Sequence, residues 1–186
     1  MQTITALFDD YDDAADAVGE LESMGVPTSD LSIVANNADG RLSPAAEDAA
    51  SGAGIGAVVG GAGGLATGLG AMAIPGVGPI VAAGWLAATA AGAAAGAVLG
   101  GAAGGIIGSL TDGADVSERD AHVYAEGIRR GGALVTARVE DDLAPQAQAI
   151  LHGSRSVDVA ERRNEYEADG WTGFDPAPGG YRPQSK

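Results

Sequence analysis

The middle of the chain reads GAGIGAVVGGAGGLATG at residues 52–68 and GAAAGAVLGGAAGGIIG at residues 92–108. In each segment glycine recurs at every fourth position, and the ten glycines of the two rows are Gly52, Gly56, Gly60, Gly64, Gly68, Gly92, Gly96, Gly100, Gly104 and Gly108. A glycine inside a helix costs about 1 kcal/mol relative to alanine. Close approach between helix backbones is the usual compensation for such rows. The two segments therefore predict helices that pack through these glycines.

A turn is expected between the two rows, at IPGVGP in residues 74–79. Residues 52–73 and 80–110 then form the two arms of a helical hairpin. With the rise of an α-helix the arms are about 33 Å and about 46 Å long, and the apolar core of a bilayer is about 30 Å thick. If the glycines of the two rows pair in antiparallel fashion, the midpoint of the hairpin lies after the expected turn and not at it. Either the helices slide, or some glycines face another copy of the chain.

Charge divides the chain of 186 residues into segments. No charged side chain lies between Asp48 and Asp112, although the whole chain has a net charge of −15. We therefore predict an uncharged hairpin at 49–111, inserted into one split domain made of 1–48 and 112–160. Residues 161–186 form a tail rich in aromatic residues, proline and glycine.

The segment before the insert has a β-α-β pattern. Residues 2–8 alternate apolar and polar side chains and predict a strand. A helix capped by Asp9 or Asp10 follows, with its apolar residues at helical spacing. Residues 30–35 predict a second strand.

The segment after the insert has an α-β-α-β pattern. Ser117 with Asp120 resembles a capping box and begins a helix. Residues 133–139 predict a strand, Asp142 caps the next helix, and residues 156–160 predict a short fourth strand. The combined order predicts an α+β fold: a ferredoxin-like antiparallel sheet with helices on one face.

Composition and motifs exclude several classes of function. The acidic charge argues against binding nucleic acid, and the absence of cysteine excludes disulfides and thiolate catalysis. The glycine rows contain no Lys or Arg to meet a nucleotide phosphate. With no nucleophile–base pair in view, we expect a non-enzymatic protein with no catalytic residue and no cofactor.

A metal site is not expected either. The densest acidic cluster lacks the spacing of a calcium loop and suits a helix N-terminus; it comprises Asp9, Asp10, Asp12, Asp13 and Asp16. His122 and His152 have no partner at ligand spacing, so surface or packing roles are expected.

Trp171 and Phe174 stand out in the tail, in the sequence GWTGFDP at 170–176. One interpretation is that this segment folds back over an exposed face or edge of the sheet. The other is that the two aromatic side chains dock on a neighbouring subunit or another protein.

Several segments together resemble the bacterial general stress protein family, of the heat-induced type with a central glycine-zipper insert. They are TITALFDDYDDAADAVGEL, DLSIVA, the glycine rows, DAHVYAEGIRRGGALVTARV and GWTGFDP. The resemblance covers nearly the whole chain and implies a stress-induced, non-enzymatic cytoplasmic protein. It provides no catalytic residues.

We therefore expect the hairpin to mediate homo-oligomerisation. Residues 1–8 contain neither a basic residue nor an apolar run of signal-peptide length, so we expect both termini in the cytoplasm. Our first hypothesis places the hairpin at or in the cytoplasmic membrane, in contact with lipid. The alternatives are a soluble homo-oligomer with the hairpins buried at its centre, or a ligand-binding regulatory domain using the sheet face near Thr3, Thr5 and Thr136.

Overall fold

The structure is a computed structural model that describes residues 1–38, 40, 70–74, 77–86, 101–153 and 155–175. Within these residues the strands are β1 (Gln2–Phe8), β2 (Leu31–Asn36), β3 (Gly70–Ile74), β4 (Gly78–Gly84) and β5 (Ala133–Val139). The helices are α1 (Tyr11–Ser23), α4 (Gly101–Gly113), α5 (Glu118–Arg129), α6 (Ala144–Leu151) and α7 (Val159–Ala168), with a 3₁₀ turn at Thr28–Asp30. The α+β class is confirmed.

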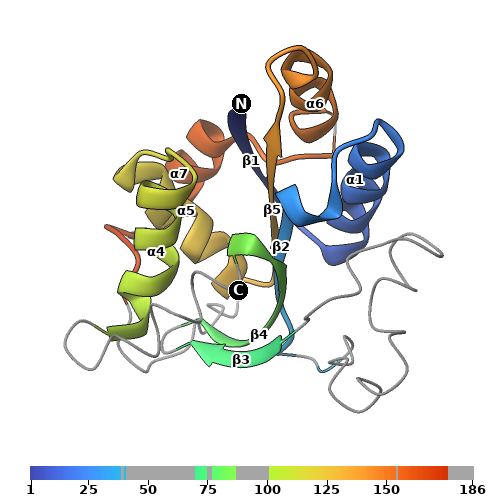
Figure 1. The fold of residues 1–186 in the computed structure, drawn as a ribbon. Coiled ribbons are helices and arrows are strands. Elements are labelled where there is room, and N and C mark those ends of the chain that lie inside the picture. The colour runs from blue at the N-terminus through green and yellow to red at the C-terminus, as the bar shows by residue number, and fades with distance from the viewer. Residues whose placement is uncertain (39, 41–69, 75–76, 87–100, 154, 176–186) are drawn as a thin grey trace.

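The strands form one antiparallel sheet in the order β1-β5-β2-β4-β3 (Figure 1). Strand β5 lies between β1 and β2, with Ile4 opposite Ala137 on one side and Ile33 opposite Val135 on the other. Strand β4 pairs with the second edge of β2, and β3 pairs with β4. Segments on both sides of the central insert therefore share one sheet.

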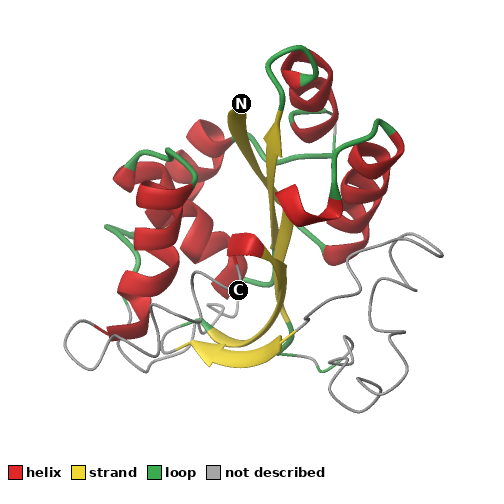
Figure 2. Cartoon of the chain, in the orientation of Figure 1, coloured by secondary structure: helices red, strands yellow, loops and turns green. Residues whose placement is uncertain are grey.

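Helices cover both faces of this sheet (Figure 2). On the first face, alternate strand residues meet α1 and α6 and form the first core, which is aliphatic apart from Phe8. Its largest fully buried side chains are Phe8, Val18, Leu21, Leu31, Ile33 and Leu151. Burial of these side chains removes apolar area from water and holds the two helices on the sheet.

The second face packs against α5, and α4 and α7 pack in turn on α5. Here Leu7, Leu134 and Ile128 belong to the second core. Gly127 allows α5 to approach β1 closely, because a Cβ at this position would lie 2.5 Å from Leu7 Cδ2. A larger residue at 127 would therefore require the Leu7 side chain to shift.

Helix signals in the sequence are confirmed in α1 and α5. The Asp10 carboxylate accepts a hydrogen bond from the Asp13 amide at 3.0 Å, and the Ser117 hydroxyl accepts one from the Asp120 amide at 3.2 Å. Each satisfies one of the free N–H groups at a helix start. Helix α5 stops before Gly131, which has a φ of 114°.

The helical hairpin is wrong around its expected turn. The expected turn at 74–79 joins strands β3 and β4, so the last residues of the 52–73 arm and the first residues of the 80–110 arm are extended. Gly78 and Gly84 have φ values of 99° and 90°, which a right-handed helix does not allow. Strand β4 instead places Ile80 and Val81 in opposite cores. The end of the second arm is helical, as expected, in α4.

The fourth expected strand is also wrong. Only an isolated bridge joins Ser156 to Phe8, and residues from Val159 onward form α7. The Asp158 carboxylate caps this helix by accepting a hydrogen bond from the Glu161 amide at 2.8 Å. The expectation of helices on one face is corrected as well, since α5 lies on the second face.

The segment boundaries change accordingly. Residues 70–74 and 78–84 of the expected insert belong to the same sheet as the flanking strands. Residues 161–168 of the expected tail belong to α7. Residues 49–69, 75–76 and 87–100 of the expected hairpin lie outside the described residues.

Candidate functional site

The predicted helix-packing site falls only partly within the described residues. Eight glycines of the two rows lie outside them: Gly52, Gly56, Gly60, Gly64, Gly68, Gly92, Gly96 and Gly100. Gly104 and Gly108 both lie in α4. A Cβ placed on Gly108 would meet no atom of the described chain within 4 Å. Close packing at Gly108 within the described chain is therefore not observed.

The opposite side of α4 is buried. Leu110 and Ala114 belong to the second core, and Leu110 is fully buried. Gly113 lies against the indole ring of Trp85, because a Cβ there would be 3.2 Å from Trp85 Cζ3. Gly108 and Leu110 are about 200° apart around the helix axis. Within the described residues, helix α4 thus packs through Leu110, and Gly108 lies on the opposite side of the helix.

The tail folds back on its own chain as far as residue 175. The ring of Phe174 is in the second core and is only 6% exposed. Its amide donates a hydrogen bond to His122 Nδ1 at 3.1 Å. Trp171 packs edge-on against Tyr166 with ring centroids 5.7 Å apart. The segment thus folds back on α5 and α7, whereas the fold-back interpretation placed it over a face or edge of the sheet; docking on another protein stays a prediction.

A buried ionic cluster on α5 was not predicted. The Glu126 side chain is 0% exposed and pairs with Arg129 at 2.6 Å and with Arg130 at 2.6 Å. The guanidinium of Arg130 also lies over the ring of Tyr166, 4.1 Å from its centroid. In the sequence, the cluster could have been indicated by the spacing of Glu126, Arg129 and Arg130 at i, i+3 and i+4. The cluster joins α5 to α7.

The acidic residues near α1 are neutralised by arginines from distant parts of the chain. Arg162 of α7 donates to both carboxylate oxygens of Asp9, at 2.7 and 3.0 Å. This hydrogen bonding lowers the pKa of Asp9 below its ordinary value of 3.8. Within the described ranges, no group of three or more His, Asp or Glu side chains is placed to hold a metal ion.

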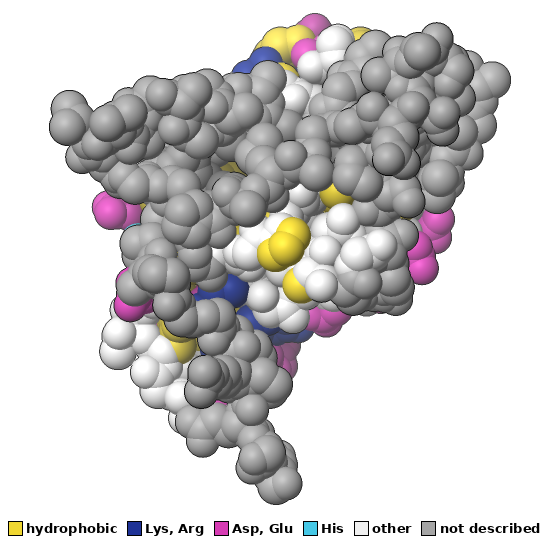
Figure 3. Space-filling model, turned by 90° about the horizontal axis from the view of Figure 1, so that it is seen from below, with side chains coloured by type: hydrophobic (Ala, Val, Ile, Leu, Met, Phe, Trp, Pro, Cys, Tyr) yellow, Lys and Arg dark blue, Asp and Glu magenta, His cyan; other side chains and the backbone are white. Residues whose placement is uncertain are grey.

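The visible charges differ in their placement on the surface. Figure 3 shows Lys and Arg side chains near the middle of the face seen from below, and Asp and Glu side chains toward its margins.

The second histidine, His152, is exposed and ends α6.

The threonines considered for ligand binding lie on the second face of the sheet. Thr5 and Thr136 are opposite each other in adjacent strands, and their hydroxyls are 3.4 Å apart within a buried hydrogen bond. The Tyr124 hydroxyl donates to the Thr5 carbonyl oxygen at 3.4 Å, and burial raises the pKa of Tyr124 to about 12. These hydroxyls are thus used within the fold.

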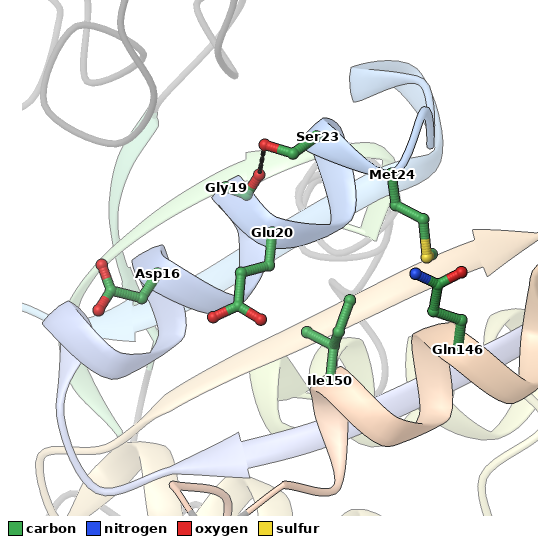
Figure 4. A pocket seen from close by; sticks show the side chains of 7 residues that line it. All are labelled: Asp16, Gly19, Glu20, Ser23, Met24, Gln146 and Ile150. Carbon is green, nitrogen blue, oxygen red and sulfur yellow. Dashed lines mark hydrogen bonds between the residues drawn. The ribbon is translucent and has the colours of Figure 1, made fainter.

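A surface groove lies on the other side of the sheet, between α1 and α6 (Figure 4). Asp16 and Glu20 line it from α1, and Gln146 and Ile150 line it from α6. Its volume is about 820 Å³. The sequence did not indicate this groove, because it depends on two helices that are far apart in the chain.

Known proteins give no further guide to the site. Comparison of the chain with protein-family models, with curated proteins and with solved structures finds no match. In the parts of the chain that the structure describes, no helix combines the length and the apolar character needed to cross a bilayer.

Proposed function

We propose that this protein acts without enzymatic chemistry, by associating with copies of itself through its central uncharged segment. The resemblance to the general stress protein family also implies a stress-induced protein without enzymatic activity. The main support for this proposal is the position of Gly108, at the described end of the second glycine row. There Gly108 lies on the side of α4 opposite Leu110, and nothing described lies within 4 Å of a Cβ at that position.

Charge favours this segment as the interface. The chain has a net charge of −15, so its charged surfaces repel those of another copy. Residues 49–111 contain no charge at all. Two copies therefore meet at the lowest electrostatic cost through this segment, and glycine allows their backbones to come close.

Two substitutions at one position test the proposal. Gly108→Ala and Gly108→Gln both replace glycine by a better helix former, so both should stabilise α4 by up to about 1 kcal/mol. Alanine adds one methyl group, whereas glutamine adds a longer side chain that ends in a polar amide. We expect Gly108→Gln to lower the mass of the assembly in light scattering and Gly108→Ala to lower it less or not at all. A Gly108→Gln chain with the wild-type mass, or a wild-type chain that is monomeric at tens of micromolar, contradicts the proposal.

The location of the assembly needs a separate experiment. We propose that the assembly is located at the cytoplasmic membrane, because the uncharged segment is the part of the chain that costs least to place in contact with lipid. Full-length protein should then float with vesicles. Protein that stays in the dense fraction, yet is large in light scattering, supports the alternative of a soluble assembly with the segment buried at its centre.

We also propose that part of the sheet is related to the ferredoxin-like fold. Strands β1, β5 and β2, with α1 and α6 on one face, keep the neighbour relations of a ferredoxin-like sheet. The bridge between Phe8 and Ser156 stands where a fourth strand would pair with β1. We propose that this unit is a ferredoxin-like domain that has lost its last strand to the start of α7.

A further inference from the structure

The groove between α1 and α6 is longer than its main hollow. A second hollow of about 290 Å³ adjoins the first and shares Glu20, Gln146 and Ile150 with it. The two together run along α1 from the level of Arg155 to Met24 at its C-terminal end. A groove between two helices is one of the recurring places where proteins bind a peptide segment.

The lining of the groove has two chemical characters. Asp16 and Glu20 extend from α1 and provide a negative wall. Met24 and Ile150 are partly buried against the first core and provide an apolar surface (Figure 4). A ligand that fits both parts must carry a positive charge beside an apolar group.

The negative wall already binds a guanidinium group from its own chain. Arg155 lies in the loop after α6, and its Nη1 and Nη2 contact Asp16 Oδ2 and Glu20 Oε1, both at 2.7 Å. The two carboxylates are four residues apart on α1, so one planar guanidinium spans them. The Arg155 side chain is 39% exposed, and exposed ion pairs of this kind exchange at little cost.

We propose that this groove binds a segment of another protein in which an arginine lies beside an apolar side chain. The arginine replaces Arg155 on the wall formed by Asp16 and Glu20, and the apolar side chain covers Met24 and Ile150. The net charge of −15 attracts a cationic partner from a distance and favours this occupant over an acidic copy of the same chain. The proposal does not depend on self-association through the central segment.

The test uses the full chain and a fluorescent synthetic peptide in which leucine and arginine recur at helical spacing. Binding is followed by fluorescence anisotropy at about 0.15 M salt, where charges more than about 8 Å apart are screened. A second peptide carries alanine in place of each leucine and keeps every arginine. We expect the second peptide to bind at least about five-fold more weakly, because it lacks the apolar group.

Paired variants locate the binding site. Glu20→Gln should weaken binding of the leucine–arginine peptide about five-fold. The matched variant Glu118→Gln removes the same charge from α5, on the other face, and should change binding less than about two-fold. Arg155→Ala should tighten binding by removing the internal competitor, and Arg119→Ala, which alters net charge equally, should not. Circular dichroism of each variant confirms that it is folded.

Several results overturn the proposal. Equal losses for Glu20→Gln and Glu118→Gln show attraction by bulk charge instead of a site. Equal binding of the two peptides shows that the apolar surface is not used. Competition by spermidine at the concentration of the peptide shows a small-polyamine site. Unchanged or weaker binding by Arg155→Ala shows that Arg155 is a structural tether and not a competitor.

Discussion

The two faces of the sheet are built differently. The first face meets α1 and α6 through an almost entirely aliphatic core, and each of these helices is joined to a neighbouring strand by a short connection. The second face buries Thr5, Ser32, Thr136 and Glu126 beside its apolar residues. It also takes Phe174 from the far end of the described chain. Apolar packing is enough for the first face, whereas the second depends on polar partners brought together from distant segments.

The largest effect that separates the faces is expected at Glu126. Glu126→Ala removes the buried carboxylate that Arg129 and Arg130 share, and loss of one partner of a buried ion pair costs about 3–5 kcal/mol. Because Arg130 also lies over Tyr166, α7 should loosen with it. Urea unfolding gives the stability, and amide exchange in α7 reports the loosening.

A variant on the first face is the control for Glu126→Ala. Leu151→Ala creates a cavity beneath α6 and should cost about 2–5 kcal/mol, while amide exchange in α7 follows global unfolding only. If Glu126→Ala costs less than about 1 kcal/mol, or leaves α7 as protected as Leu151→Ala does, the second face does not depend on its ionic cluster.

A smaller effect is expected at His122. His122→Ala removes the acceptor of the Phe174 amide, and one such hydrogen bond is worth about 1 kcal/mol. The Phe174 amide should then exchange faster while the strands stay protected. His122→Gln offers a carbonyl oxygen as a substitute acceptor and should restore part of the protection. Exchange at Phe174 that is identical in wild type and His122→Ala argues against this bond as the anchor of the tail.

The smallest effect is expected at the Asp9–Arg162 pair, where α7 meets the end of β1. The folded-state pKa of Asp9 is lowered, so its contribution is present above the ordinary value of 3.8 and is lost as the pH falls through the lowered value. The Asp9 side chain is 68% exposed, so solvent screening limits the contribution to a few tenths of a kcal/mol.

Thermal melts of wild type and Asp9→Asn check this pH dependence. The wild type should have the higher melting temperature at pH 6, and the two should converge only as the pH falls below 3.8 and through the lowered pKa of Asp9. A difference that grows as the pH falls would reverse the sign of the argument.

The sequence predicts the flanking elements well because their signals are local. The alternation in residues 2–8 and the caps at Asp10 and Ser117 require only neighbouring residues, and each is confirmed. The central segment fails for a physical reason. Strands β3 and β4 lie between the two glycine rows and contain none of their ten glycines, so the helical spacing of the rows does not extend to residues 70–84. Residues 78–84 instead form β4, because they pair with the edge of β2 that β5 leaves free.

Other features require contacts that the sequence does not display. Asp158 and Glu161 form a helix-start pattern that competes with the apolar alternation of Val157 and Val159, and the cap prevails. The groove and the position of Phe174 depend on which face each helix covers. The ionic cluster is intermediate, because the spacing of Glu126 and its arginines is visible in the sequence while its burial is not.

The central place of β5 has a consequence for synthesis on the ribosome. Strands β1 and β2 are made early, but in the described sheet they are joined only through β5, whose residues 133–139 emerge after the whole uncharged segment. During translation the nascent chain therefore exposes a long glycine- and alanine-rich stretch before its sheet can close. Such a delay is the condition under which holding chaperones are most needed.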